Sequence, residues 1–140
     1  MTATEISEAS VRIRRTIDAP IDRVFTALTD AAELGRWYGG DVLDVEFYAV
    51  DARPGGAFSF TMRDGDETYD FESEFLEIVD NERVVHTWYV GEVTYELAEV
   101  GGGTEVTLTH DGRPEHETTA VHTEGWVAAI EKLQTVVAGA

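Results

Sequence analysis

The middle of the chain, residues 43–110, consists of short segments in which apolar and polar residues alternate, separated by turn-forming residues. In one segment Phe58, Phe60 and Met62 fall on the same face, and serine and threonine lie between them. Alternation with period two is typical of half-buried strands, and short connections favour antiparallel pairing. The predicted strands are residues 43–50, 57–62, 68–75 with a continuation to 79, 83–90, 93–97 and 106–110. The phase shift after Phe75 predicts a β-bulge near Leu76.

Different patterns flank this region. Residues 11–18 alternate and predict one further strand, whereas residues 1–10 show no periodicity and are expected to be a disordered lead. Pro20 opens a short helical pattern, and Asp30 is placed to cap a second one. From about residue 118 apolar residues recur at helical spacing to the end of the chain. We therefore expect one domain over residues 11–138.

This order of elements predicts an α+β fold of the helix-grip type. It comprises a curved antiparallel sheet of about six to seven strands, two short helices after the first strand, and a long C-terminal helix packed across the sheet. Only the helices can cover the apolar sheet face. A strongly bent sheet around one helix leaves concave space, which is a natural place for a ligand cavity.

The charge balance excludes several partners. The chain has 28 acidic and 10 basic residues, a net charge of -18, and no cysteine. Such a chain repels nucleic acid and anionic membranes, and no apolar run is long enough for membrane insertion. The polar N-terminus is no signal peptide, so we expect a cytoplasmic protein, a monomer or weak dimer. The dispersed acidity leaves two explanations open: adaptation to a salty cytoplasm, or a basic partner protein.

Two adjacent aromatic residues, Trp37 and Tyr38, stand at the end of the second short helix before a pair of glycines. Neighbouring residues cannot face the same way on a helix or a strand. We expect one ring to close the end of the cavity and the other to face the rim, with Trp37 the better candidate for the wall.

Aromatic side chains on the predicted inner faces are the strongest functional indication. They either fill a core or line a partly open pocket, and both readings stand. Arg15 falls on the apolar side of its strand, where it would pair with an acid or orient a ligand together with Tyr95, His110 or His122. The candidate ligand-binding residues are Arg15, Trp37, Tyr38, Phe58, Phe60, Phe71, Phe75, Trp88, Tyr95, His110, His122 and Trp126.

Catalytic and metal-binding patterns are absent from the sequence. No serine or threonine stands in a nucleophile motif, and the histidines have no spacing typical of a metal site. We expect no cofactor and no metal, and no catalytic constellation. Glu74 and Glu77 flank the predicted bulge, and one of them could point inward as a general acid or base.

Several motifs in order resemble a known superfamily. "IDAPIDRVFTALTDAAELGRWYG", "RPGGAFSF", "RVVHTW", "GGGTEVTLTH" and "GWVAAIEKL" are similar to the SRPBCC superfamily (START and Bet v 1-like). Within it, they resemble the homologues of the activator of heat-shock-protein-90 ATPase. The similarity spans about residues 11–137. His86 stands where this family commonly has an aromatic residue, and Tyr38 where a second tryptophan is common.

The resemblance implies a helix-grip fold and leaves three functions open. The leading one is binding of a small hydrophobic or aromatic molecule between the sheet and the C-terminal helix. The second is a co-chaperone-like interaction module that docks on a chaperone, with a link to the stress response. The third is a cofactor-free cyclase or hydrolase that acts in the cavity.

Overall fold

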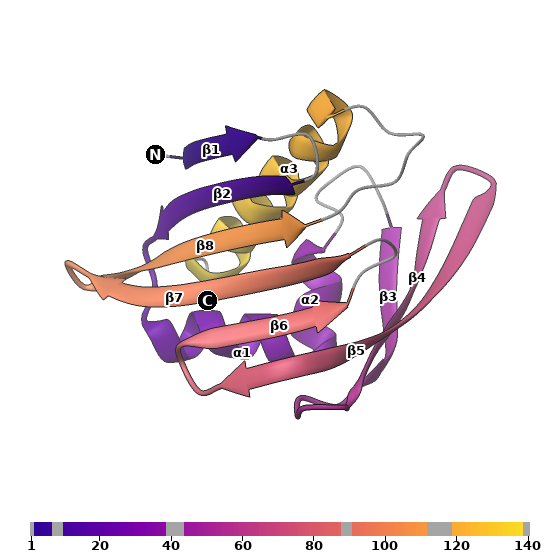
Figure 1. Ribbon diagram of the computed structural model, residues 1–140, viewed down its shortest axis with the longest axis horizontal. Helices are drawn as coiled ribbons and strands as arrows, with labels where there is room; N and C mark the ends of the chain where they lie inside the picture. Colours follow the sequence, from indigo (N-terminus) through magenta and orange to yellow (C-terminus); the bar gives the residue numbers. More distant parts are fainter. Residues whose placement is uncertain (1, 7–9, 39–43, 88–90, 112–118, 139–140) are drawn as a thin grey trace.

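The computed structural model describes residues 2–6, 10–38, 44–87, 91–111 and 119–138, and within these ranges the side chains of residues 2–6, 10, 64, 119–125 and 138 are not described. The described chain contains one eight-stranded sheet with the order β1-β2-β8-β7-β6-β5-β4-β3, in which all neighbours are antiparallel (Figure 1). The elements are β1 (Thr2–Ile6), β2 (Ser10–Ile17), α1 (Ile21–Thr29), α2 (Ala31–Trp37), β3 (Asp44–Val50), β4 (Ala57–Asp64), β5 (Glu67–Val79), β6 (Arg83–Thr87), β7 (Glu92–Val100), β8 (Gly103–Asp111) and α3 (Thr119–Ala138).

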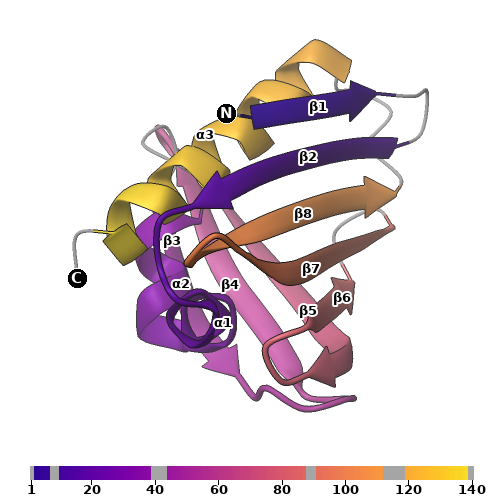
Figure 2. The ribbon, with the colours of Figure 1, turned by 90° about the vertical axis from the view of Figure 1, so that its left-hand side faces the viewer.

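The three helices lie on one face of the sheet, and the sheet curves around them (Figure 2). The inward stripe of α3 buries Trp126, Ile130, Leu133 and Val137. Opposite them, the inward residues of the strands form the other half of one hydrophobic core. This arrangement confirms the predicted α+β helix-grip architecture, because only α3 and the two short helices cover the sheet.

β5 belongs to two halves of the sheet. Its first half pairs with β4, its second half pairs with β6, and the register shifts between Phe75 and Glu77. The predicted β-bulge is confirmed, and it bends the sheet where the two halves meet. We call residues Asp44–Phe75 the arm and the remaining described elements the body.

The second short helix begins as predicted. The Asp30 carboxylate accepts a hydrogen bond from the Glu33 backbone N–H at 3.1 Å. The Glu33 carboxylate itself turns away from the cap and binds the guanidinium groups of Arg23 and Arg36. This pairing ties α1 to α2 and fixes the turn between them.

The expectation of a disordered lead is wrong for Thr2–Ile6. These residues form β1, which pairs with β2 from Thr2 opposite Arg15 to Ile6 opposite Val11. β1 is also the reason why the sheet exceeds the predicted six to seven strands. An edge strand has one neighbour and is held largely by main-chain hydrogen bonds. Its sequence therefore need not show the apolar alternation from which a strand is predicted.

Candidate functional site

Trp37 and Tyr38 both enter the interior, which corrects the expectation that one of them faces the rim. Their exposed fractions are 0% and 3%, and their ring centroids lie 5.1 Å apart. Trp37 is the last residue of α2, while Tyr38 has an extended backbone with φ −63° and ψ 136°. The change of backbone conformation between the two residues lets both side chains point inward. The Trp37 indole N–H donates to the Ala27 carbonyl at 2.8 Å, which fixes its ring.

Tyr38 is the centre of a continuous cluster of rings. Its ring lies 5.8 Å from Trp126 of α3 and 5.5 Å from Phe60 of β4, so it connects the helix to the arm. Contacts of this kind link all members of what we call the ring cluster. It consists of Trp37, Tyr38, Phe47, Phe58, Phe60, Phe71, Phe75, His86, Tyr95, His110 and Trp126.

The cluster brings together most of the predicted site residues. Trp37, Tyr38, Phe58, Phe60, Phe71, Phe75, Tyr95, His110 and Trp126 are all members. Trp88 lies outside the described residues, and so does the side chain of His122. A role of these residues in ligand binding stays a prediction.

Two members of the ring cluster, Phe47 and His86, were not among the predicted site residues, and the more deeply buried of the two is His86. It is 1% exposed and its ring stacks on Phe58 with centroids 3.9 Å apart and an interplanar angle of 22°. Its Nδ1 lies 2.7 Å from the Thr87 carbonyl oxygen and donates to it. Burial lowers the pKa of His86 to about 4, so the ring is neutral at neutral pH. Residues 83–90 are apolar on both faces, which is why the pattern did not orient this histidine.

The hydroxyl groups of Tyr38 and Tyr95 interact with each other deep in the cluster. Burial raises the pKa of both phenols, so both remain protonated. The Tyr95 hydroxyl is fully buried and, within the described part of the chain, does not reach good hydrogen-bond geometry. A buried hydroxyl in this state costs about 1–3 kcal/mol. The Tyr95 hydroxyl can therefore form a hydrogen bond with a further polar atom.

His110 anchors the helix side of the cluster. The Trp126 indole N–H donates to Nδ1 of His110 at 3.1 Å, and both residues are buried. Because Nδ1 accepts this hydrogen bond, it carries no proton, and the ring is a neutral imidazole. The bond joins α3 to β8 at the level of the ring cluster.

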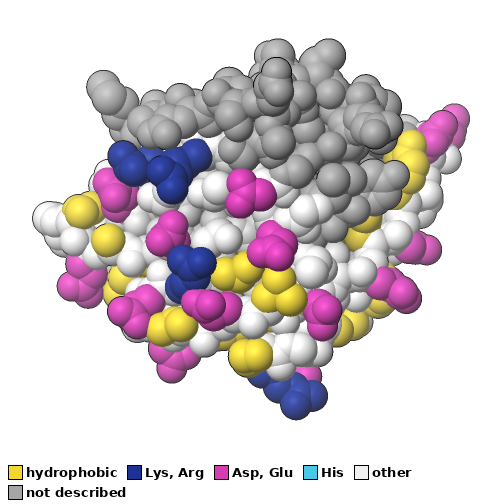
Figure 3. All heavy atoms as spheres, viewed as in Figure 1, with side chains coloured by type: hydrophobic (Ala, Val, Ile, Leu, Met, Phe, Trp, Pro, Cys, Tyr) yellow, Lys and Arg dark blue, Asp and Glu magenta, His cyan; other side chains and the backbone are white. Residues whose placement is uncertain are grey.

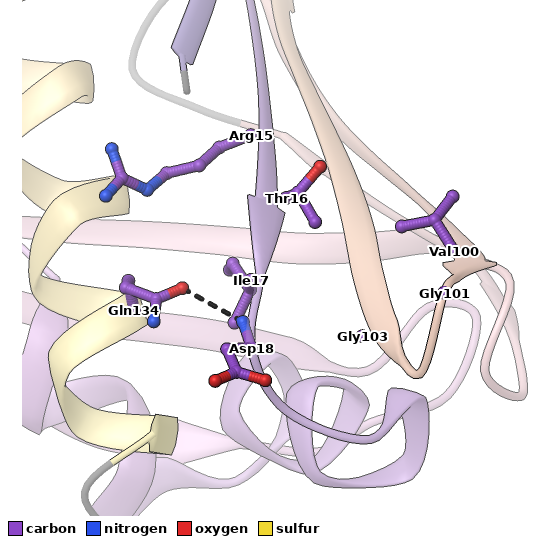
Figure 4. Close-up of a pocket in the computed structure, with 8 residues that line it drawn as sticks. All are labelled: Arg15, Thr16, Ile17, Asp18, Val100, Gly101, Gly103 and Gln134. Carbon is purple, nitrogen blue, oxygen red and sulfur yellow. Dashed lines mark hydrogen bonds between the residues drawn. The ribbon is translucent and has the colours of Figure 1, made fainter.

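Arg15 lies apart from the ring cluster. Its guanidinium extends toward α3 (Figure 4). There, Nη1 of Arg15 lies 3.9 Å from a carboxylate oxygen of Glu131. It borders an open groove between β2, α3 and the glycine-rich β7–β8 turn. In this groove Gln134 accepts a hydrogen bond from the Asp18 backbone N–H at 3.2 Å. The sequence left an ion pair and a ligand contact open, and the structure places Arg15 near an acid.

The ring cluster does not line the groove beside Arg15, nor a second open groove in the described part of the chain. The second of these grooves lies between β5, β6 and β7, beside Arg83 and Leu97. In the interior the aromatic rings pack directly on one another, and Phe58, Phe60 and Phe75 are at most 1% exposed. In the ring cluster the aromatic side chains are thus packed against one another, with a few polar atoms buried among them.

The buried polar atoms of the ring cluster can form hydrogen bonds, and burial shifts the pKa values of two of its members. A general acid or base works best with a pKa near the working pH. Burial moves the pKa of His86 down and that of Tyr95 up, away from neutrality in both cases. Glu74 and Glu77, the predicted acid–base candidates, are exposed. Among the described residues no group of three or more His, Asp or Glu side chains is arranged to hold a metal ion.

A curved antiparallel sheet gripping a C-terminal helix, with an aromatic interior between them, defines the class of helix-grip domains. A family model described as activator of Hsp90 ATPase homolog 1-like protein matches residues 18–138. The chain belongs to this family, which is part of the SRPBCC superfamily. Among functionally curated proteins, none matches the chain.

Solved structures of similar fold come from several bacteria. A protein from Chromobacterium violaceum is 23% identical with a TM-score of 0.86, and the match covers 94% of this chain and 98% of that one. An AHSA1-like protein from Aeromonas hydrophila is 25% identical with a TM-score of 0.81, covering 93% and 92%. A Rhodobacter sphaeroides protein is 20% identical with a TM-score of 0.84, covering 99% of both chains.

Family and fold together support either a ligand-binding domain or a domain like the Hsp90 ATPase activators. None of the helices in the described part of the chain has the length and apolar character needed to cross a membrane.

Proposed function

We propose that the domain binds a small hydrophobic or aromatic molecule against the ring cluster. The observation that supports this most is the buried Tyr95 hydroxyl, which keeps hydrogen-bonding capacity within a wall of aromatic rings. Rings supply apolar area and stacking, and a few polar atoms fix the orientation of a ligand. The bound molecule would carry at least one oxygen to meet the phenol.

The uncharged side chains of the ring cluster also restrict the charge of the ligand. His86 and the two tyrosines are uncharged at neutral pH, and Nδ1 of His110 accepts a hydrogen bond from Trp126. Among the described residues, the buried polar side chains include no arginine, lysine or carboxylate. An ion buried without a partner is strongly disfavoured, so we expect an uncharged ligand.

The test uses 2-naphthol as an uncharged aromatic probe with one hydroxyl. We expect it to shift the indole N–H signals of Trp37 and Trp126 in protein-observed NMR. Replacing Tyr95→Phe removes only the hydroxyl and should weaken binding about threefold to tenfold, the effect of one lost hydrogen bond. The matched control is Tyr48→Phe, because Tyr48 is 53% exposed and should leave the affinity unchanged.

Two results would count against this proposal. If saturating 2-naphthol leaves every indole signal in place, the ring cluster takes no ligand of this kind. If the Tyr95→Phe and Tyr48→Phe proteins bind the probe equally well, the hydroxyl does not orient it.

The family description supports a second candidate function, a protein contact of the kind made by Hsp90 ATPase activators. Its test is the ATPase rate of a purified bacterial Hsp90-type chaperone with and without the domain. An unchanged rate, with no binding in sedimentation velocity, would remove this candidate.

A further inference from the structure

The ring cluster meets solvent along one row of side chains on the arm. Among its members, Phe47 and Phe71 are half-buried and all the others are buried. In the sheet register these two residues lie on either side of Phe60. Phe71 stacks on Phe60 with ring centroids 5.0 Å apart and an interplanar angle of 24°. A molecule from solvent can therefore contact the cluster at this row without displacing a buried ring.

A second apolar row lies next to the first, nearer the β4–β5 turn. It consists of Val45, Met62 and Tyr69, which are paired across β3, β4 and β5. Side chains two residues apart on a strand share a face and lie about 7 Å apart, so the second row continues the first on the inner face of the arm. Val45 is 7% exposed, Met62 is half-buried and Tyr69 is 45% exposed.

The apolar surface ends at a polar side chain. The next residue on this face of β5 is Glu67, and its carboxylate accepts a hydrogen bond from the Tyr69 hydroxyl at 2.6 Å. The hydroxyl is thus already bonded, and Tyr69 offers its ring to a ligand. A tyrosine ring supplies contact area at little cost in conformational entropy. The surface beside the ring cluster is therefore one row deep before it becomes charged.

We propose that the ligand of the ring cluster has a second apolar part, which lies on Met62 and Tyr69. This inference rests on the proposed function and adds the shape of the ligand. The molecule would combine an uncharged, oxygen-bearing aromatic ring with an apolar extension about 7 Å long, such as a short alkyl chain. Met62 and Tyr69 would then set the length of the molecules that bind.

The small accessible area of the second row favours such a chain over a protein partner. A standard protein interface buries about 800 Å² of each partner. In the second row only Tyr69 is largely accessible, because Val45 is buried and Met62 is half-buried. In Figure 3 the hydrophobic side chains at the right-hand edge, where Figure 1 places the hairpin of β4 and β5, form a narrow group rather than a broad patch.

The test compares 2-naphthol with 6-butyl-2-naphthol, which adds a butyl chain to the same ring and hydroxyl. Binding of both is followed through the indole N–H signals of Trp37 and Trp126. The butyl compound should bind wild type about tenfold more tightly or better, because burying methylene groups is favourable. Intermolecular nuclear Overhauser effects should connect the butyl protons to the Met62 methyl group.

Variants at one position separate the two parts of the ligand. Tyr69→Ser should reduce the gain from the butyl chain about threefold to tenfold and change the affinity for 2-naphthol less than about twofold. Tyr69→Phe keeps the ring and should keep the gain. The matched control is Tyr48→Ser, because Tyr48 is an exposed tyrosine of the arm outside the second row. It should leave both affinities unchanged.

Failure of this inference differs from failure of the proposed function. If 2-naphthol binds but the butyl chain adds no affinity, or if Tyr69→Ser keeps the gain, this inference is overturned and the proposed function stands. If neither compound binds, both are overturned. If sedimentation shows a dimer that Tyr69→Ser dissociates, a second copy of the chain occupies the second row, and the inference is again overturned.

Discussion

The body and the arm each contain a tyrosine on the inner face of the sheet, but in opposite settings. In the body, Tyr95 is 2% exposed and lies between Trp37 and His86, with its hydroxyl buried. In the arm, Tyr69 is 45% exposed and its hydroxyl binds a surface carboxylate. One tyrosine therefore contributes to the core and the other to the surface. The difference arises because α3 and α1 pack against body strands β2, β7 and β8, whereas the hairpin of β4 and β5 extends beyond the helices (Figure 1).

Charge follows the same division. The arm carries -7 over residues 44–75, and the other residues share the remaining -11, from -18 less -7. Per residue the arm is about twice as acidic as the rest of the chain. Repulsion among like charges is therefore strongest in the arm. The end of the arm at the β4–β5 turn contributes few aromatic residues to the core. We therefore expect stability to be concentrated in the body and in the buried arm residues that pack against it, such as Phe58, Phe60 and Phe75.

The largest expected effect is the loss of a core ring. Trp37→Ala should lower the free energy of unfolding by about 3–5 kcal/mol, since it removes a fully buried ring and leaves a cavity. Tyr69→Ala, near the β4–β5 turn of the arm, should change the free energy of unfolding by less than about 0.5 kcal/mol. Urea unfolding followed by circular dichroism measures both. Similar losses of stability in the two variants would mean that the end of the arm around Tyr69 contributes as much to stability as the core does.

The second effect is specific to the buried histidine. The pKa of His86 is about 4 in the folded chain, against an ordinary value of 6.5. Between these values the unfolded chain binds a proton that the folded chain does not, so stability falls as the pH drops. The loss begins below about pH 6.5, is complete near pH 4, and amounts to about 3 kcal/mol.

The variant His86→Phe isolates this contribution. It keeps a ring that can stack on Phe58 and removes the titrating group. The many carboxylates titrate in both proteins, so their contribution cancels in the difference. The wild type should lose more stability than His86→Phe between pH 6.5 and 4, as followed by urea midpoints. Parallel pH profiles would show that the histidine is not held neutral by its surroundings.

Much of this arrangement was predictable from the sequence because periodicity reports burial. Phe58 and Phe60 were expected on the same, inner face of their strand, and both are buried. The bulge after Phe75 was visible as a change of phase. In both cases the positions of the apolar side chains indicate which face of the strand lies against the core.

Three features could not be predicted in this way. β1 is an edge strand that main-chain pairing holds, and its residues carry no alternation. The strand of His86 is apolar on both faces, so only the register opposite Phe75 and Val93 reveals its direction. The joint burial of Trp37 and Tyr38 depends on the change of backbone conformation at a helix end. All of these are properties of chain pairing or conformation rather than of composition.

The third prediction concerns salt. Stability should rise from low to molar salt, because salt screens the repulsion among acids. Glu72→Gln combined with Glu74→Gln should raise the thermal midpoint at low salt by about 2 °C and flatten its salt dependence. Glu92→Gln combined with Glu99→Gln should do less. A flat salt dependence of the wild type would contradict adaptation to a salty cytoplasm and leave the basic partner as the explanation for the acidity.

The smallest expected effect is at Arg15, which separates an ion pair from a ligand contact. Its partner Glu131 has a side chain that is 58% exposed, so Arg15→Gln should change the free energy of unfolding by less than about 0.5 kcal/mol. Arg14→Gln is a close control, since Arg14 faces Glu105 at the same 3.9 Å on the neighbouring position of β2. The two variants should unfold alike in urea. Binding of 2-naphthoate then decides the role of Arg15: we expect Arg15→Gln and Arg14→Gln to bind it equally weakly. A loss confined to Arg15→Gln would show instead that this guanidinium holds a carboxylate, and that the ligand site extends from the ring cluster toward α3.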